Sequence, residues 1–174
     1  MTNAVLKTLE ERRSIRSFQD KKVDADKLAA ILKAGTYAAT GMGKQSPIIV
    51  VIDSAQMREK IRSMNASVMG NPASDPFYGA PTILLVLANA DVHTCIEDGS
   101  LVLGNLMNAA YSLGVDSCWI HRAREEFESE EGKALLKSWG IEGNYVGVGH
   151  LAIGYRNCEY PTPRQRKNDY IYVV

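Results

Sequence analysis

Two arginine-rich segments stand near opposite ends of the chain, RRSIRSF at residues 12–18 and PRQRK at residues 163–167. A phosphate monoester carries about −1.5 to −2 charges, and each charge-assisted hydrogen bond to it contributes about 1.5–3 kcal/mol. Three such bonds approach the roughly 8 kcal/mol of micromolar binding. Together the two segments predict a phosphate-binding site. Its candidate contacts are Arg12, Arg13, Ser14, Arg16, Arg164 and Arg166.

The first segment also has a simpler interpretation. It follows an amphipathic stretch with Val5, Leu6 and Leu9 on one face, which predicts a short helix running to about Arg12. Cations at a helix C-terminus complement the helix dipole and contribute about 0.3–1 kcal/mol without any ligand. If the helix continues, Arg12 and Arg16 share a face, one turn apart. The residues alone leave both interpretations open.

Other motifs exclude several common kinds of site. The loop ATGMGKQS at residues 39–46 lacks the first glycine and the hydroxyl residue of a nucleotide-binding P-loop, because Ala38 and Gln45 stand at those positions. The chain has no GxGxxG dinucleotide fingerprint, no GxSxG nucleophile elbow and no HxxxH metal motif. We therefore expect neither a metal site nor hydrolase chemistry.

Two histidines have competing interpretations. His150 lies in a glycine-rich apolar run, YVGVGHLAIGY, which is more typical of a satisfied core histidine than of a ligand. His121 follows the apolar residues CWI at the predicted end of a strand, where backbone groups commonly face a ligand. A solvated strand end and a ligand contact both stay open for His121.

Charge and composition exclude several kinds of partner. The 174 residues include 20 Lys+Arg and 20 Asp+Glu, so no basic field attracts nucleic acid or a membrane surface. The longest apolar runs are too short for a transmembrane helix, and the N-terminus does not resemble a signal peptide. Three widely spaced cysteines support no disulfide framework. We expect one domain over residues 1–174, located in the cytoplasm.

The predicted elements combine helices and strands. Continuous apolar runs predict buried strands at residues 48–53, 82–88, 115–121 and 145–155. Helical periodicity predicts helices within residues 24–39, 55–70, 96–113 and 130–139. The helix at 96–113 is apolar on nearly every side, which is typical of a fold centre or a subunit interface. The apolar tail 170–174 is expected to pair with a sheet, in its own chain or in a partner's.

Five motifs of this chain occur in the order seen in one flavoprotein family. They are RRSIRSF, ATGMGKQSP, FYGAPTILLV, GSLVLGNLMNAAYSLGVDSCWI and PRQR. From about Val5 to Val174 the chain resembles the FMN-dependent nitroreductases, as a compact bacterial-type member. The resemblance implies an α+β fold with a mostly antiparallel sheet flanked by helices. It also implies a homodimer with FMN at the interface and an exchanged C-terminal strand.

The resemblance assigns roles to individual residues. Four of them match phosphate and ribityl contacts: Arg12, Ser14, Arg164 and Arg166. Arg13 matches a backbone contact, Arg16 a cation near the pyrimidine edge of the flavin, and Asn65 an amide contact with the ring. The loop that reaches the flavin from the other subunit is matched by Thr40, Gly41 and Gln45. The strand end along one ring face is matched by Trp119, Ile120, His121 and Arg122.

The implied function is redox chemistry on small molecules. By resemblance the protein would oxidise NADH or NADPH and then reduce a nitroaromatic, a quinone or a similar planar acceptor in a ping-pong cycle. This scheme requires no side-chain acid or base, so no catalytic residue is nominated. Alternatives on the same fold are ene-reduction, dehalogenation, and a non-catalytic flavin-binding or redox-sensing role. Many relatives have an acidic residue or glycine where this chain has His121 and Arg122.

Overall fold

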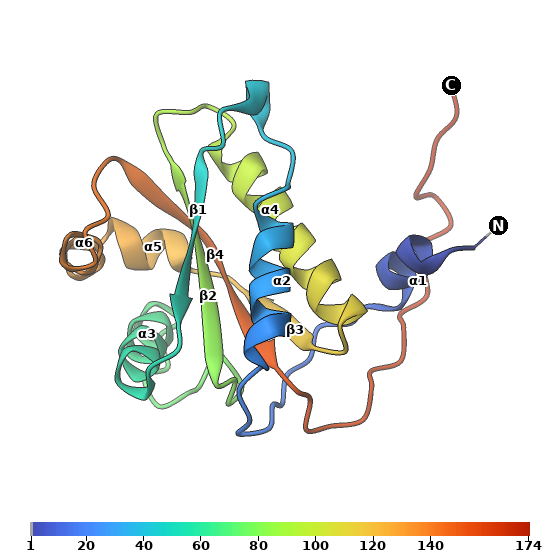
Figure 1. Cartoon of the computed structure of the whole chain (residues 1–174), viewed down its shortest axis with the longest axis horizontal. Helices are drawn as coiled ribbons and strands as arrows, with labels where there is room; N and C mark the ends of the chain where they lie inside the picture. Colours follow the sequence, from blue (N-terminus) through green and yellow to red (C-terminus); the bar gives the residue numbers. More distant parts are fainter. Residues whose placement is uncertain (1) are drawn as a thin grey trace.

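The computed structural model describes residues 2–174 as a four-stranded sheet with helices on both faces (Figure 1). The strand order is β1-β2-β4-β3, and every neighbouring pair is antiparallel, which confirms the predicted fold class. The strands are β1 (Pro47–Ile52), β2 (Thr82–Asn89), β3 (Asp116–Ile120) and β4 (Tyr145–Gly154). The helices are α1 (Ala4–Glu11), α2 (Ala25–Gly35), α3 (Ala55–Val68), α4 (Cys95–Ser112), α5 (Ala123–Glu128) and α6 (Glu130–Ser138), with a 3-10 turn, η1 (Gly41–Gly43).

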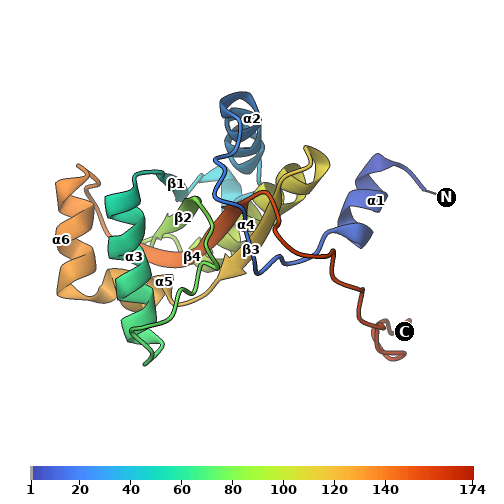
Figure 2. The ribbon, with the colours of Figure 1, turned by 90° about the horizontal axis from the view of Figure 1, so that it is seen from below.

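The two faces of the sheet carry separate apolar cores. Every residue of β2 from Thr82 to Ala88 is buried, and successive side chains of a strand point to opposite faces. Leu85 therefore packs in the core formed with α3, α5 and α6, while Leu84 packs in the core formed with α2 and α4. Figure 2 shows these two groups of helices from below. The sheet is thus covered on both faces.

Helix α4 lies along the sheet, as its sequence predicts. Leu103 and Leu106 are fully buried against the sheet and α2, whereas Leu101 on another side of the helix is 50% exposed. Gly114 follows the helix with a φ of 70°, a conformation that glycine adopts without steric cost. The helix therefore has an apolar surface that its own chain leaves partly uncovered.

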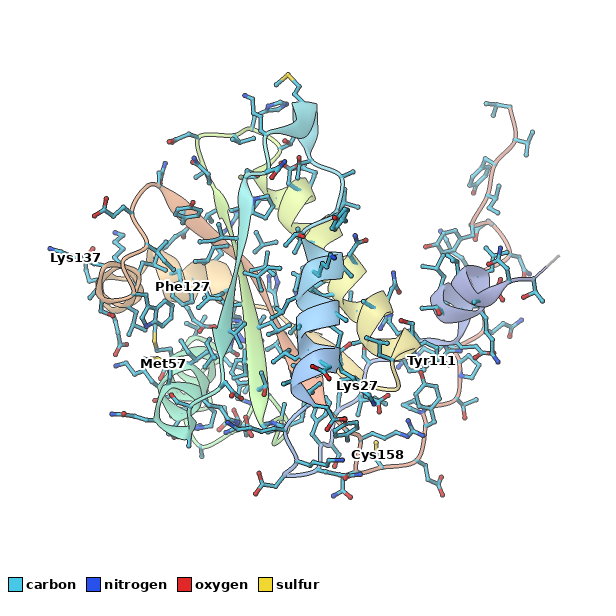
Figure 3. All side chains as sticks on the ribbon, viewed as in Figure 1. Lys27, Met57, Tyr111, Phe127, Lys137 and Cys158 are labelled. Carbon is cyan, nitrogen blue, oxygen red and sulfur yellow. The ribbon has the colours of Figure 1, made fainter. Side chains whose placement is uncertain are left out.

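Helix α5 packs directly on β4, at residues where the sequence predicted no element. Gly147 permits this close approach, because a Cβ added there would lie 2.1 Å from the backbone oxygen of Ala123. The buried side of the helix consists of Ala123, Glu126 and Phe127, and Figure 3 shows Phe127 between α5 and the sheet. An acidic residue thus occupies a core position in this helix.

Helix α1 and the C-terminal tail extend away from the sheet on the same side of the molecule (Figure 1). No residue of α1 is buried, and Val5 and Leu9 are 67% and 55% exposed. Residues 170–174 form no strand with the sheet of their own chain, and all five are exposed. Of the two pairings predicted for the tail, the one within its own chain is wrong, and the one with a partner stays a prediction.

Within residues 2–174, no helix is both long and apolar enough to cross a membrane. The three cysteines are free, and Cys118 is buried in the core as expected for a strand residue.

Candidate functional site

The first arginine segment leaves α1 and runs beside the edge strand β3. Helix α1 ends at Glu11, with Arg12 as its cap, so the helical continuation that would place Arg12 and Arg16 on one face does not occur. Instead, Ser14 forms a parallel bridge with Ser117, and the backbone N–H of Ile15 donates to the carbonyl oxygen of Ser117 at 3.1 Å. The fully buried Ile15 side chain anchors the segment in the core.

Two guanidinium groups of this segment hold buried N–H groups without an acceptor. Arg12 Nη1 and Arg13 Nε are buried and have no hydrogen-bonding partner in the structure, and the same is true of Ser117 Oγ. The Nη1 group of Arg13, in contrast, donates to the carbonyl oxygen of Glu10 at 2.7 Å. A buried donor without an acceptor costs about 1–3 kcal/mol, and more when it is charged. These atoms therefore suit an anionic ligand.

The Cys118 thiol lies next to the same basic groups. Burial raises its pKa, and the charges of Arg16 and Arg12 together with a hydrogen bond from Ser14 oppose that rise. Three predicted contacts therefore influence the thiol of one residue of β3. The structure thus brings Arg12, Ser14 and Arg16 together, although they are not on one helical face.

The second arginine segment remains apart in the exposed tail. Arg164 and Arg166 are exposed, and neither forms a hydrogen bond or an ion pair with any other residue in the described range 2–174. The chain just before them is nevertheless anchored beside α1, because the Tyr160 hydroxyl donates to the carbonyl oxygen of Glu11 at 2.9 Å. Tyr111 of α4 also points toward α1 and donates to Glu11 Oε2 at 2.9 Å (Figure 3).

The predicted strand end lies at the junction of β3 and α5. Trp119 is half-buried, Ile120 is buried and His121 is exposed. Arg122 has a φ of 79°, a left-handed conformation that is unusual for a residue other than glycine. Asn65, from α3, reaches this junction: its Nδ2 donates to the carbonyl oxygen of His121 at 2.9 Å. The structure thus brings Asn65 to the predicted strand end, where its own side chain is fully buried.

A buried acid and a buried base lie behind this junction. Oε2 of Glu126 faces Nε2 of His150 at 3.5 Å, and both side chains are inaccessible to solvent. Burial raises the pKa of Glu126 to about 8, although the Asn65 hydrogen bond and the Arg122 charge oppose the rise. Burial and the Arg122 charge lower the pKa of His150 to about 3. Both shifts therefore favour the uncharged forms, in spite of a geometry that resembles an ion pair.

In this pair, His150 differs from what its sequence predicts, and Glu126 is a buried residue that was not predicted. His150 lies in the core, but it is not a satisfied histidine, because neither ring nitrogen has a hydrogen-bonding partner. Glu126 was missed because AREEFESEE has the composition of a charged surface segment. The available signal was the position of Glu126 three residues after Ala123, with Phe127 four residues after it, since residues three and four apart share a helix face.

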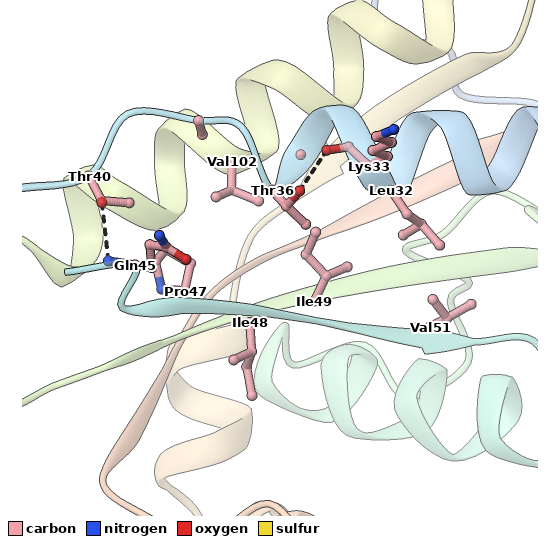
Figure 4. Close-up of a pocket in the computed structure, with 12 residues that line it drawn as sticks. Leu32, Lys33, Thr36, Thr40, Gln45, Pro47, Ile48, Ile49, Val51 and Val102 are labelled. Atoms are coloured by element: carbon pink, nitrogen blue, oxygen red, sulfur yellow. Dashed lines mark hydrogen bonds between the residues drawn. The ribbon is translucent and has the colours of Figure 1, made fainter. Parts of the chain in front are cut away.

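The third predicted group lies at the other side of the sheet. The hydroxyl of Thr40 accepts from the backbone N–H of Gln45 at 3.1 Å, and the N–H of Gly41 donates to Asp98 at 2.9 Å. Thr40 and Gln45 line a mostly apolar groove of about 460 Å³ between α2 and β1, where Ile49 also points into the groove (Figure 4). In this chain the loop therefore neighbours β1, the edge strand opposite β3.

An antiparallel sheet covered by helices on both faces, with a basic segment along one edge strand, defines an α+β class of protein. The chain belongs to the nitroreductase family, whose sequence profile matches residues 9–155. It is similar to a crystal structure of a Bacteroides fragilis nitroreductase with bound FMN, at 30% identity and a TM-score of 0.89 over 99% of this chain and 100% of that one.

Two further relatives extend the comparison. A Desulfitobacterium hafniense nitroreductase with bound FMN shares the fold, with 23% identity and a TM-score of 0.86 over the whole of both chains. A protein of Archaeoglobus fulgidus, provisionally named an NADH dehydrogenase/NAD(P)H nitroreductase, is 27% identical over 162 residues, which cover 88% of this chain and 86% of that protein. Among residues 2–174, no group of three or more His, Cys, Asp or Glu side chains is arranged to hold a metal ion.

Proposed function

We propose that the protein is an FMN-dependent oxidoreductase that uses NADH or NADPH to reduce nitroaromatics, quinones or similar planar acceptors by a ping-pong mechanism. The observation that carries this proposal is the pair of buried, unpartnered guanidinium N–H groups of Arg12 and Arg13 beside β3. A phosphate group would satisfy both donors. Two similar nitroreductases hold FMN, which has such a phosphate.

Each basic residue has a defined task in this proposal. Arg12, Arg13 and Ser14 bind the phosphate and ribityl chain, and Arg164 and Arg166 close over them from the tail. Arg16 places a cation near the pyrimidine edge, where positive charge favours the reduced cofactor. When bound, FMN supplies the two-electron chemistry that links the nicotinamide donor to the acceptor. The protein contributes position and electrostatic field, so no side-chain acid or base is assigned.

The proposal includes a homodimer, because one chain separates the predicted contacts. The loop with Thr40 and Gln45 lies near the edge strand β1, whereas the arginine segment lies along the opposite edge strand, β3. A second copy can bring its own loop to the arginine segment of the first. The unpaired edge of β1 and the adjacent apolar groove also suit the exposed tail 170–174 of a partner, because an edge strand accepts an additional strand.

A visible absorption spectrum of the purified protein tests the cofactor, followed by identification of what heat releases. We expect a yellow protein that releases about one FMN per chain. Loss of two charge-assisted bonds weakens binding by about 10²- to 10⁴-fold, so Arg164→Glu combined with Arg166→Glu should empty the site. The matched control is Lys133→Glu combined with Lys137→Glu on α6, at the far side of the molecule (Figures 1 and 3).

The reaction is tested on the same sample. Bleaching of the bound flavin by NADH or NADPH, followed by recovery with a quinone or a nitroaromatic, would support the proposed activity. Recovery only with an activated alkene or a halogenated acceptor would favour another reaction on this fold. Bound flavin that no nicotinamide reduces would favour a binding or sensing role. A colourless protein that takes up no added FMN would refute the proposal.

A further inference from the structure

Arg122 has a backbone conformation that a side chain disfavours. Its φ of 79° brings Cβ close to the following carbonyl group, and a non-glycine residue keeps such a conformation only where the surrounding structure holds it. The residue joins β3 to α5 directly after His121. Contacts that fix this turn therefore also fix the strand end.

Asn65 supplies two of those contacts from α3. Its Nδ2 donates to the carbonyl oxygen of His121 at 2.9 Å, and its Oδ1 accepts from Nε of Arg122 at 3.0 Å. The second Nδ2 hydrogen goes to Oε1 of Glu126. Rotating this amide by half a turn would set donor against donor at Arg122 and acceptor against acceptor at the other two positions. Glu126 thus helps to determine the orientation of the amide.

Glu126 faces His150 of β4, with Oε2 3.5 Å from Nε2. A protonated carboxyl can donate from Oε2 to Nε2 of His150 while Oε1 accepts from Asn65, which satisfies two buried atoms that otherwise lack partners. The remaining Nδ1–H of His150 lies among aromatic rings, with the Phe77 ring centroid 5.3 Å from that of the imidazole. The carboxyl can therefore connect β4 to the amide on α3.

The charged groups near Glu126 come from three helices. Arg122 and Glu125 belong to α5 and the loop before it, and both influence the Glu126 carboxyl. Lys60 of α3 and Glu131 of α6 pair with each other at a small cavity of about 180 Å³, which Glu126 also lines. An apolar residue at this core position would avoid the desolvation penalty of a carboxyl group. Unlike an apolar residue, the carboxyl gives Asn65 a fixed hydrogen-bond acceptor.

We propose that Glu126 is a positioning residue, which acts through Asn65 to hold the left-handed turn at Arg122 and the strand end at His121. This inference rests on the proposed function in one respect only, that the strand end faces the flavin ring. The network itself lies within one chain, so it can be tested with and without the cofactor. It requires an acceptor at Oε1 rather than a negative charge.

Three variants separate positioning from packing. Glu126→Met keeps a linear side chain but removes the acceptor, and Glu126→Gln keeps an acceptor without a charge. Phe127→Leu disturbs the core of the same helix, where the Phe127 ring lies 6.4 Å from that of His150, but removes no hydrogen-bonding group of the network. We expect Glu126→Met to accelerate hydrogen exchange of the amides in residues 119–128 by about tenfold, the effect of one ordinary hydrogen bond. The FMN dissociation constant should rise by a similar factor. Glu126→Gln and Phe127→Leu should remain within about twofold of the wild type in both measurements.

The outcomes distinguish this inference from the proposed function. If Glu126→Met behaves like the wild type, or Phe127→Leu accelerates the same amides equally, the positioning role is wrong. If the wild type binds no FMN, the proposed function fails, but the exchange comparison still decides the role of Glu126. Should Glu126→Met not fold, Asn65→Ala breaks the same network one bond closer to the turn. Unchanged exchange of residues 119–128 in that variant would overturn the inference.

Discussion

Replacing Glu126 by glutamine should change how the stability of the protein depends on pH. The pair holds one proton in the native state, because the pKa of Glu126 is raised to about 8 and that of His150 is lowered to about 3. In the unfolded chain the same groups titrate near 4.5 and 6.5. Between about pH 4.5 and 6.5 both states therefore bind one proton, which folding moves from the imidazole to the carboxyl.

Above pH 6.5 this balance is lost. The unfolded chain has then released both protons, while the native state keeps one on Glu126 until about pH 8. Stability falls with rising pH wherever the native state binds more protons than the unfolded state. At about 1.4 kcal/mol per pH unit, the wild type should lose about 2 kcal/mol between pH 6.5 and 8. Glutamine binds no proton, so Glu126→Gln should lack this loss.

Urea unfolding at pH 6.5 and at pH 8.5, at one protein concentration and equal FMN saturation, measures the effect. The difference in unfolding free energy between variant and wild type should become more favourable to the variant by about 2 kcal/mol at the higher pH. Structural effects that do not depend on pH cancel in this comparison. Glu128→Gln, at an exposed position of the same helix, is the matched control and should follow the wild type. Parallel pH profiles for Glu126→Gln and the wild type would refute the assignment of the proton to Glu126.

Three further changes test other parts of the structure. Gly147→Ala should lower the free energy of unfolding by about 1–3 kcal/mol in a urea titration, because its methyl group would overlap the Ala123 backbone. Gly140→Ala is the comparison: its methyl group meets no neighbour, so it tests only the cost of the left-handed backbone conformation. Deletion of residues 170–174 should convert the proposed dimer into a monomer in light scattering, and an unchanged mass would exclude tail exchange. Tyr111→Phe should cost about 0.5–1.5 kcal/mol in unfolding free energy through loss of the bond to Glu11, and no cost would show that this bond is not formed in solution.

The fold could be predicted where the pattern of apolar residues alone identifies a segment as a helix or a strand. Strand β2 is recognisable because TILLVLA is apolar throughout and lies buried between two other strands. Helix α4 is recognisable for the same reason, with Gly114 as its stop. Helix α5 was missed because four of the six residues in AREEFE are charged, so only its packing against β4 reveals which side is buried.

The site could be predicted only in part, because its residues meet through tertiary structure. The arginines of RRSIRSF indicated an anion-binding site. They are positioned by a β-bridge between Ser14 and Ser117, however, and not by helical spacing. Asn65 and Glu126 lie 61 positions apart, and no local pattern connects their side chains. The pairing of Arg12 with Arg164 stays a prediction, since within residues 2–174 the hydrogen bond of Tyr160 to Glu11 joins the tail to α1 before Arg164 is reached.

The arrangement of the sheet explains why a second copy belongs to the proposal. An open four-stranded sheet has two edge strands. The arginine segment lies beside one of them, β3, and the apolar groove lies between the other, β1, and helix α2. A monomer would leave that groove, the exposed apolar side of α4 and the apolar tail in water together. Exposed patches of this kind typically mark an interface. In the proposed homodimer, the tail of one copy would cover the groove beside β1 of the other, and Thr40 and Gln45 of one copy would approach the arginines of the other.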